Sequence, residues 1–380
     1  MKVLIISGDF YPVNSPRSFR TTELAKELSR QGNEVTLMYS VKDESSIEFC
    51  QQNNIHLIDL GPLKWRSFLN SNNKIINIVI RIINRLLLQL FEYPSIELMF
   101  RVRKALSKIT AKYDLLITIA VPHTIHWGVS LIGSKRRNLA SCWVADCGDP
   151  FMGDRNDSFN KLFYFAWFEH KWCKRADFIT IPKIEMKKNF YPKYHDKFVE
   201  IPQGFNFNET KKLIKPYSGN KIPTFAYAGA FIQGRGGRDP RPLLDFLLST
   251  NEQFSFVIYT RNRSLLSKYI EKADPRLQIY DVIPRSSLLQ ELSNMDFLIN
   301  IAYDPESQLP SKLIDYALVG RPILNIYNDK LDEKLKADLL DFLKGNYSNK
   351  LKIDGIDKYN IEAVAKKFLE LANKKSKGLS

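Results

Sequence analysis

The chain has 380 residues, 44% of them hydrophobic, which is enough for two globular domains with apolar cores. Its formal net charge of +15 favours anionic partners; the basic residues form no single tract and no nucleic-acid motif occurs, so we expect phosphorylated small molecules or anionic lipid and not nucleic acid. The four cysteines and five histidines show no metal-binding spacing, which predicts reduced thiols in the cytoplasm and no metal ion.

The first half of the chain alternates strand-like and helix-like segments. Residues 2–7 are predicted to be a buried strand and not a signal peptide, because they lack a longer apolar core and a small-residue cleavage site. Apolar periodicity and glycine stops predict the other elements. The expected strands are 2–7, 34–39, 55–60, 115–120, 141–145, 178–181 and 198–201, and the expected helices are 21–31, 74–91, 96–112 and 158–175.

The second half repeats this pattern. Its expected strands are 224–227, 256–259, 277–280, 297–301 and 323–326, and its expected helices lie near 241–249, 264–273, 286–294 and 311–319. Such alternation predicts an α/β fold with a parallel, doubly wound sheet in each half. We expect two Rossmann-like domains facing each other across a cleft, 1–203 and 204–360, joined by the polar stretch 203–220, with a C-terminal helix at about 360–380 packing back on the first domain.

The segment 74–91 differs from the other predicted helices in its wide apolar face. Its polar residues recur at helical spacing and are Lys74, Asn77, Arg81, Asn84, Arg85 and Gln89. The charges on this stripe argue against a membrane-spanning helix. Two interpretations remain: a helix lying in the membrane interface on anionic headgroups, or a core helix packed on the first sheet. The flanking Lys64, Trp65, Arg66 and Phe68 favour the membrane.

A predicted anion site lies near residue 311. Ser311 is expected to cap the helix 311–319, and Gly320 to end it. A helix N-terminus at the carboxyl edge of a parallel strand binds anions. Lys312 in the first turn is electrostatically unfavourable without a negative ligand, and Asp315 follows one turn later. This pattern suits a diphosphate with a ribose attached; otherwise Lys312 points to water and Asp315 only complements the helix terminus.

A glycine-rich loop at 233–238 follows another strand and precedes a helix. Glycines let the backbone approach phosphates, and the arginine fork matches phosphate oxygens. Arg235 and Arg238 are therefore candidate phosphate ligands, and the alternative is a solvated loop.

The order of these motifs resembles that of the retaining GT-B glycosyltransferases usually called family 4, over nearly the whole chain. The motifs that carry the resemblance are Ile5–Pro12, Val121–His126, Trp143–Pro150, Ile201–Asn206, Phe225–Gly229 and Ser311–Gly320. The resemblance implies a nucleotide-sugar site in the second domain, an acceptor site in the first, retention of the anomeric configuration, and neither metal nor cofactor.

Residue roles follow from the same resemblance. It implies donor contacts from Gly229, Arg235, Arg238, Ser311, Lys312 and Asp315, catalytic roles for His126, Asp146 and Asp149, and acceptor contacts from Gly8, Arg17 and Arg20. Purely structural roles are the alternatives: His126 packs in the fold, Asp146 and Asp149 belong to turns, and Arg20 only begins a helix. The chain departs from the family where Asp315 and Ser307, beside Glu306, replace two glutamates and where Ala230 replaces an arginine.

Our hypothesis is a glycosyltransferase moving a sugar from a nucleotide-diphosphate donor to a glycan or polyprenyl-diphosphate-linked acceptor, in surface polysaccharide assembly. We expect it in the cytoplasm, peripheral to the inner membrane through 74–91. One alternative is a nucleotide-sugar epimerase of GT-B fold, which needs no acceptor. Another is a non-catalytic, membrane-associated protein that binds nucleotide-sugars. An NAD enzyme is disfavoured because no GxGxxG motif follows a strand with the required later acid.

Overall fold

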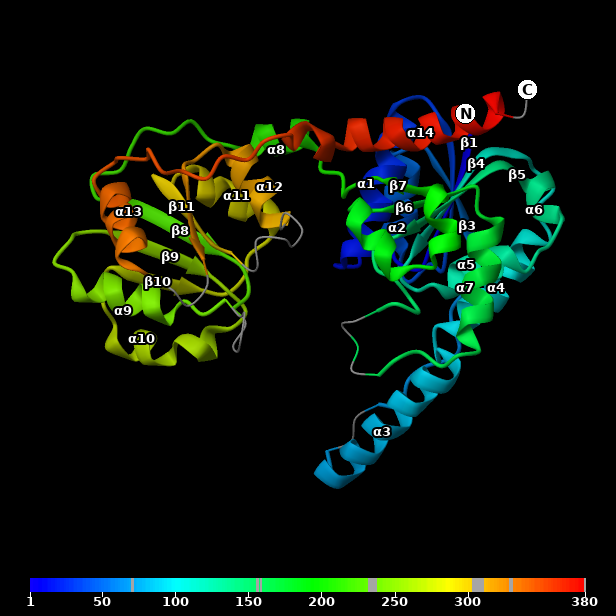
Figure 1. Ribbon diagram of the computed structural model, residues 1–380, viewed down its shortest axis with the longest axis horizontal. Helices are drawn as coiled ribbons and strands as arrows, with labels where there is room; N and C mark the ends of the chain where they lie inside the picture. The colour runs from blue at the N-terminus through cyan, green and yellow to red at the C-terminus, as the bar shows by residue number, and fades with distance from the viewer. Residues whose placement is uncertain are drawn as a thin grey trace. The chain divides into compact units, whose positions relative to one another are not determined.

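The computed structural model describes residues 1–69, 72–154, 157, 159–231, 238–302, 311–327 and 331–378, with the side chain of Ser311 excepted. Its contacts divide the chain into two compact units (Figure 1). Unit 1 comprises Met1–Phe205 and Lys358–Ser380, and unit 2 comprises Asn206–Asp357. Each unit holds one parallel sheet with helices between its strands, so the predicted α/β fold of two Rossmann-like domains is confirmed.

The sheet of unit 1 has seven parallel strands in the order β3-β2-β1-β4-β5-β6-β7. They are β1 (Lys2–Ser7), β2 (Glu34–Tyr39), β3 (Ile55–Asp59), β4 (Tyr113–Ala120), β5 (Ala140–Cys147), β6 (Phe178–Ile181) and β7 (Phe198–Glu200). Successive strands are added on one side of β1 up to β3 and on its other side from β4 onward, so the strand order reverses between β1 and β4. Ligands of open α/β sheets bind at the carboxyl ends of the strands beside such a reversal. Both faces of the central strands are buried, which explains why they are continuous apolar runs.

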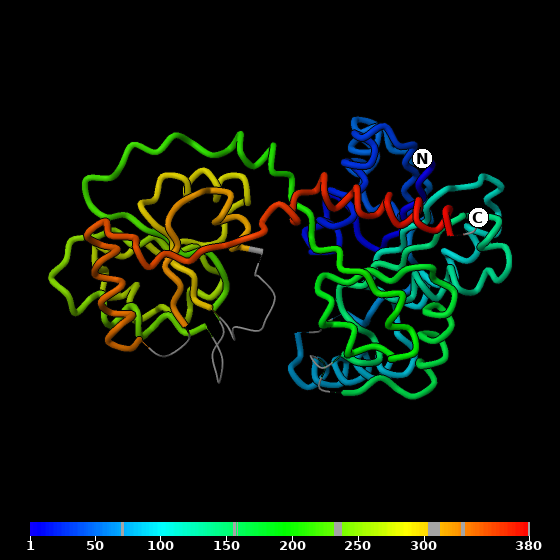
Figure 2. Tube along the Cα trace, turned by 45° about the horizontal axis from the view of Figure 1, so that its top comes forward, coloured from blue at the N-terminus to red at the C-terminus, as the bar shows by residue number. Residues whose placement is uncertain are grey.

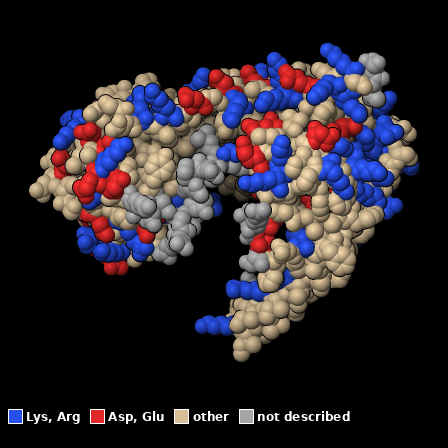
Figure 3. Space-filling view, viewed as in Figure 1, with Lys and Arg blue, Asp and Glu red and all other residues tan. Residues whose placement is uncertain are grey.

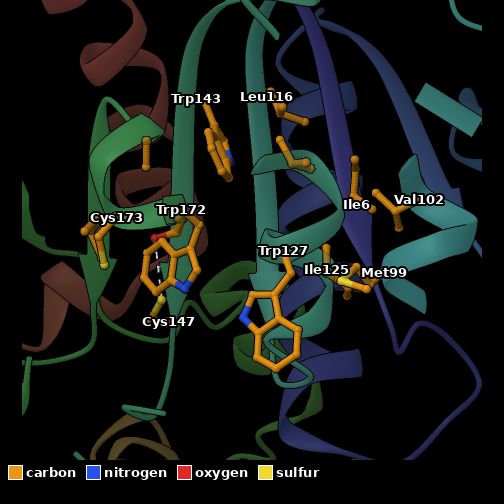
Figure 4. Packing of buried hydrophobic residues seen from close by; sticks show 14 of the residues in the cluster. Ile6, Met99, Val102, Leu116, Ile125, Trp127, Trp143, Cys147, Trp172 and Cys173 are labelled. Carbon is orange, nitrogen blue, oxygen red and sulfur yellow. Dashed lines mark hydrogen bonds between the residues drawn. The ribbon is translucent and has the colours of Figure 1, made fainter. Parts of the chain in front are cut away.

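Two hydrophobic cores enclose this sheet. One contains Trp127, Trp143 and Trp172 (Figure 4), and the other includes the apolar face of the C-terminal helix. The helical segments are α1 (Pro16–Arg30), α2 (Glu44–Gln52), α3 (Lys74–Phe91), α4 (Ile96–Leu106), α5 (Thr124–Ser130), α6 (Lys135–Leu139), α7 (Phe165–Arg175), η1 (Ile184–Asn189), η2 (Pro192–Lys197) and α14 (Ile361–Lys377). Helix α14 packs on β5 and α1, so the C-terminus of the chain belongs to unit 1 (Figure 2).

Helix α3 has the bounds predicted from its periodicity, and Figure 1 shows it projecting away from the sheet of unit 1. Asn73 caps its N-terminus by accepting hydrogen bonds from the amides of Ile75 and Ile76. None of its residues is buried, so the interpretation as a core helix is wrong. Within the described residues, no helix combines the length and apolar character needed to cross a membrane.

The sheet of unit 2 has five parallel strands in the order β10-β9-β8-β11-β12 and reverses between β8 and β11. The strands are β8 (Thr224–Ala228), β9 (Ser255–Tyr259), β10 (Leu277–Tyr280), β11 (Phe297–Ala302) and β12 (Ile323–Tyr327). The helical segments are α8 (Phe207–Leu213), α9 (Arg241–Ser249), η3 (Arg263–Leu266), α10 (Ser267–Lys272), α11 (Arg285–Ser293), α12 (Ser311–Val319) and α13 (Glu333–Leu343), and η4 (Ile356–Tyr359) crosses the boundary to unit 1. Gly320 ends α12 as predicted, with a φ of +75°.

Several predicted boundaries differ from the structure; the helix predicted at 96–112, for example, ends at Leu106. Helix α1 begins five residues before the predicted start, because Ser15 caps it and Pro16 fits the first helical position. The helix predicted at 158–175 starts only at Phe165, and the carbonyl of Asn160 before it accepts a hydrogen bond from Gln89 of α3. The stretch 203–220, predicted to be a linker, contains α8, capped by Asn206.

Candidate functional site

Gly8 lies at the carboxyl edge of the unit 1 sheet, beside the reversal point, where β1 meets the loop after β4. A Cβ atom on Gly8 would lie 2.6 Å from Cδ of Pro122, in the loop after β4. Only a glycine therefore allows the end of β1 to lie this close to that loop. This is a structural reason for the glycine, and its predicted contact with an acceptor stays a prediction.

Arg20 and Asp146 form a buried, bidentate ion pair behind this edge. The Nε–Oδ2 distance is 2.9 Å and the Nη2–Oδ1 distance 2.7 Å, with side chains only 5% and 3% exposed. Thr180 donates a further hydrogen bond to Oδ1 of Asp146, and Arg20 also donates to the carbonyls of Ile201 and Pro202. These contacts use both charged groups within unit 1 and tie α1 to β5, β6 and the segment after β7.

Arg17 and Asp149 form the accessible charged pair of the same edge. Their Nη2–Oδ2 distance is 3.0 Å, and their side chains are 19% and 51% exposed. The guanidinium of Arg17 lies over Gly148, where a Cβ atom would come within 1.5 Å of Nη2. Nε2 of His123 donates to the carbonyl of Asp149 at 3.1 Å. Arg17 and Asp149 are thus placed where a solvent-borne acceptor can reach them, whereas Arg20 and Asp146 are not.

His126 on α5 is fully buried against Trp172. Its Nδ1 lies 2.8 Å from Oγ1 of Thr118 and its Nε2 lies 3.4 Å from Sγ of Cys147. Burial holds the pKa of His126 well below its usual value, so the ring is neutral. Its predicted catalytic role stays a prediction, and the contacts seen here are all internal.

His123 lies one helical turn before His126 and nearer the accessible pair. Burial lowers its pKa to about 3, and its Nδ1 has no hydrogen-bond partner among the described residues. His123, His126 and Cys147 bring their ligand atoms within 4.8 Å of one another. Such a set of two imidazoles and a thiol has donor atoms suited to zinc, so the expected independence of metal needs a direct test.

Glu169 of α7 is a buried acid that the sequence analysis did not single out. It is accessible over only 1% of its surface, and its Oε1 has no hydrogen-bond partner among the described residues. Burial raises its pKa to about 8, and a hydrogen bond from the amide of Met152 opposes this only weakly. Glu169 is therefore protonated in the folded protein at neutral pH.

Replacing Glu169 with glutamine should remove a pH-dependent loss of stability. Below about pH 4.5 the Glu169 carboxyl is protonated in both the folded and the unfolded wild type. Between about pH 4.5 and pH 8 it is protonated only in the folded state, so the wild type loses stability as the pH rises. The free energy of unfolding of Glu169→Gln minus that of wild type should therefore rise by about 1.4 kcal/mol per pH unit across this window. Urea melts followed by tryptophan fluorescence measure this difference, with the exposed Glu48→Gln as control. A difference that does not change with pH would contradict the prediction.

Hydrogen bonds from tyrosine hydroxyls fix the backbone at the carboxyl edge of the unit 2 sheet. The hydroxyl of Tyr316 on α12 accepts a hydrogen bond from the amide of Ala228 at 2.8 Å. Gly229 follows directly and donates its amide to the carbonyl of Tyr259, while the hydroxyl of Tyr227 donates to the carbonyl of Ala230. The loop after β8 therefore leaves the sheet in one defined direction, beside the reversal point and α12.

The amino group of the Lys312 side chain is buried at this edge. It lies 4.5 Å from the ring centroid of Tyr227 and has no hydrogen-bond partner among the described residues. Nε of Arg238 is likewise buried and has no hydrogen-bond partner among the described residues. Burial, and next the charge of Arg238, lower the pKa of Lys312 to about 7. Two neighbouring basic side chains without an acidic partner among the described residues are an arrangement that an anionic ligand would complete.

Asp315 lies one turn along α12 and is paired with Arg285 of α11. Oδ1 of Asp315 accepts hydrogen bonds from Nε at 3.1 Å and Nη2 at 2.5 Å, and Nη2 also reaches Oγ1 of Thr210. Burial raises the pKa of Asp315, and Arg285 opposes this rise. Arg285 was not predicted, because no local motif marks a residue 30 positions away as the partner of Asp315.

We expect Asp315→Ala to raise the donor KM roughly tenfold while changing kcat less than about threefold, because a lost hydrogen bond to ribose weakens ground and transition states alike. Steady-state kinetics with varied donor measure this. Arg285→Ala is the matched control, since it removes the partner and leaves the carboxylate free for ribose. Equal KM effects of both variants would mean that Asp315 acts only through Arg285.

Several predicted positions cannot be placed. Arg235, Glu306 and Ser307 lie outside the described residues, as does the side chain of Ser311. Of the residues predicted to contact a donor, the structure brings Gly229, Arg238, Lys312 and Asp315 to the same edge of unit 2. Of the unit 1 residues, Gly8, Arg17 and Asp149 lie on its carboxyl edge, and His126, Asp146 and Arg20 lie behind it.

No protein-family model and no curated protein matches the chain. Solved structures do: a glycosyltransferase from Rickettsia africae is 13% identical with a TM-score of 0.61, covering 99% of both chains. The lipopolysaccharide outer core galactosyltransferase WaaB is 12% identical with a TM-score of 0.59, covering 99% of this chain and all of its own. A UDP-GlcNAc 2-epimerase from Neisseria meningitidis is 11% identical with a TM-score of 0.54, covering 98% of this chain and all of its own. At such identities the likeness establishes the fold alone, and that fold is the two-domain GT-B fold that glycosyltransferases share with these epimerases.

Proposed function

We propose that the protein is a retaining glycosyltransferase that moves a sugar from a nucleoside-diphosphate donor bound at unit 2. The observation that carries this proposal is a pair of cationic groups, the ammonium of Lys312 and Nε of Arg238, both buried without a hydrogen-bond partner among the described residues. A donor diphosphate supplies the missing negative charge, and α12 presents its N-terminus at the same edge. The glycosyltransferases among the structures of similar fold support the same reaction class.

The chemistry asked of these residues is electrostatic. Binding of the diphosphate would raise the pKa of Lys312 from about 7, so the side chain would be fully protonated when the sugar leaves. Lys312 and Arg238 then stabilise the charge that develops on the departing diphosphate. The side chains described here include no carboxylate that we place as a nucleophile on the sugar. We therefore propose front-face transfer, in which the leaving phosphate takes the proton of the acceptor hydroxyl.

We place the acceptor at the carboxyl edge of unit 1, beside Arg17 and Asp149. The pair is accessible, and its arginine can hold an anionic group such as the diphosphate of a polyprenyl-linked glycan. Arg20 and Asp146 support this edge from behind. His123 is the histidine nearest the accessible pair, through its bond to the carbonyl of Asp149.

Transfer is tested by incubating the full chain with UDP-, GDP-, CDP- and TDP-sugars and polyprenyl-diphosphate-linked or free glycans, with and without EDTA. The proposal predicts an acceptor-dependent product that retains the donor anomeric configuration and forms equally well in EDTA. Isomerised donor in the absence of acceptor would favour the epimerase that shares this fold. Nucleotide binding without either product would favour a non-catalytic binding protein, and loss of product in EDTA would contradict metal independence.

We further propose that α3 seats the protein on the membrane that carries a lipid-linked acceptor. Its apolar side chains are largely exposed, and exposed rings from the segment before α7 and from the first turn of α7 extend this surface. We name this the apolar surface: it comprises Ile75, Ile78, Val79, Ile82, Leu86, Leu90, Phe159, Phe163 and Trp167. A polar stripe with Lys74, Arg81 and Arg85 accompanies it. Exposed aliphatic side chains beside cations and aromatic rings fit the interface of an anionic bilayer.

Vesicle co-sedimentation tests this seating. Ile78→Glu/Ile82→Glu should lower binding to vesicles containing phosphatidylglycerol by roughly a hundredfold, because two charges would enter the apolar layer. Gln51→Glu/Gln52→Glu adds the same charge to exposed positions of α2 and should bind nearly as wild type does. Wild type that does not bind such vesicles would refute the membrane seating without touching the transfer reaction.

A further inference from the structure

A basic cavity of about 580 Å³ opens at the amino-terminal edge of the unit 1 sheet. This edge is opposite to the carboxyl edge that carries Gly8 and Asp149, since the cavity residues precede β5 and β6. The cavity is lined by Gly133, Ser134, Arg136, Arg137, Lys171, Lys174, Arg175, Ala176, Asp177, Lys197 and Lys375. Seven of these residues are cationic and one is acidic, so the lining carries a large excess of positive charge.

Asp177 accounts for only two of these cations. Its Oδ2 accepts from Nη1 of Arg136 at 3.0 Å and from the amide of Trp143 at 2.9 Å, and its Oδ1 lies 3.1 Å from Nζ of Lys375. Its carboxylate holds α6 and α14 to the sheet, and among the described residues it forms no direct ion pair with the other five cations.

The end of α7 accounts for two more. Nζ of Lys197 donates to the carbonyls of Cys173, Lys174 and Ala176 at 2.8–3.0 Å, and Arg175 donates to the carbonyl of Ser130. These bonds satisfy carbonyls that a helix C-terminus leaves unpaired, and they complement its negative dipole. Helix capping thus explains Lys197 and Arg175 without a ligand.

Arg137, Lys171 and Lys174 remain. Among the described residues none of them has an acid as an ion-pair partner, and Lys171 lies instead 4.0 Å from the ring centroid of Trp167. Placing surplus like charges around one cavity costs free energy unless a counter-charge binds. Arg137 and Lys174 are exposed and Lys171 is half-buried, so all three can reach an anion in this cavity.

We propose that this basic cavity binds a phosphate-bearing anion at a site separate from the donor and acceptor edges. Guanidinium and ammonium groups at several angles around one hollow suit the oxygens of a phosphate. The inference does not depend on the transferase reaction.

The phosphate can come from a lipid headgroup or from solution. Helix α7 links the cavity to the apolar surface, because Trp167, 55% exposed, lies one turn before Lys171. Figure 3 shows Lys and Arg gathered on unit 1 beside the uncharged surface that runs down to α3. A protein seated on α3 would thus bring the cavity near headgroups, which is the source we favour.

The variant Arg137→Gln/Lys174→Gln removes two surplus cations that make no structural hydrogen bond with their side chains in the described residues. Lys187→Gln/Lys188→Gln is the matched control, since it removes the same charge from exposed positions of η1 in the same unit. The probes are inorganic phosphate, followed by ³¹P NMR line broadening, and vesicles of phosphatidylcholine with or without phosphatidylglycerol.

With a lipid source, the Arg137/Lys174 variant should bind phosphatidylglycerol vesicles about tenfold more weakly than wild type, with the control variant near wild type. With a soluble source, its phosphate broadening should fall about tenfold while vesicle binding stays unchanged. Either result supports the site. The proposal fails if both probes bind the variant as they bind wild type, or if the control variant loses as much binding.

Discussion

Lys312→Met is expected to lower kcat/KM for the nucleotide-sugar roughly a hundredfold, because it removes a preorganised cation from the departing diphosphate. The same change should stabilise unit 2. Wild type folds with an ammonium that burial and Arg238 disfavour, at a pKa of about 7, whereas the unfolded chain holds its proton up to about pH 10. At about pH 8 the folded lysine is mostly neutral while the unfolded one is protonated, so the methionine variant avoids a penalty of about 3 kcal/mol.

Opposite signs for activity and stability separate a ligand-binding lysine from a structural one. Steady-state kinetics with varied donor measure the loss of activity, and hydrogen exchange of the strands of unit 2 measures the gain in stability. Lys334→Met, on the exposed side of α13, is the matched control and should change neither quantity. A variant with normal turnover, or one that loses activity and stability together, would argue against the proposed role of Lys312.

Arg20→Met should lower the free energy of unfolding of unit 1 by about 3–5 kcal/mol, because Asp146 would remain buried with its charge uncompensated. All five tryptophans lie in unit 1, so tryptophan fluorescence during urea unfolding reports this unit. The double variant Arg20→Met/Asp146→Asn removes the stranded charge and should recover more than half of the loss.

Comparing Arg17→Met with Arg20→Met shows how much the burial of an ion pair adds to its contribution to stability. Arg17→Met breaks the same kind of pair on the same helix, and Asp149 is half exposed, so we expect a loss below about 1 kcal/mol. Equal losses for Arg17→Met and Arg20→Met would show that burial does not decide the contribution of these pairs. No recovery in the double variant would show that the loss comes from packing, including the contact of Arg20 with Phe368.

Much of the fold follows from local pattern. Strands such as Lys2–Ser7 and Phe178–Ile181 and the helices α3, α9 and α12 have the bounds that periodicity and glycine stops predict. Their pattern repeats every few residues, so a short window contains the information. The start of α7 was predicted seven residues too early, because the aromatic residues before Phe165 continue the apolar pattern although they lie outside the helix.

The candidate site was only partly predictable for the same reason. Lys312 and Asp315 were found because a helix N-terminus after a parallel strand is a local signal. Periodicity could not show that Arg20 pairs with Asp146, or that Arg285 pairs with Asp315, since these partners meet only through the fold. The basic cavity joins segments from residue 133 to residue 375, so no sequence window contains it.

Whether α3 is a core helix was likewise beyond the sequence. Its wide apolar face fits a buried helix and an interfacial helix equally well. Exposure along the whole of Lys74–Phe91 decides against the core, and only the tertiary structure contains that information.

The central claim is that Lys312 and the loop after β8 hold a nucleoside diphosphate. Hydrogen–deuterium exchange of the full chain, with and without UDP, GDP, CDP and TDP, tests it directly. We predict that one of these nucleotides protects residues 225–231 and 311–319, and that Lys312→Met abolishes the protection. No protection of these segments by any of the four nucleotides, or protection that survives the loss of Lys312, would contradict the claim.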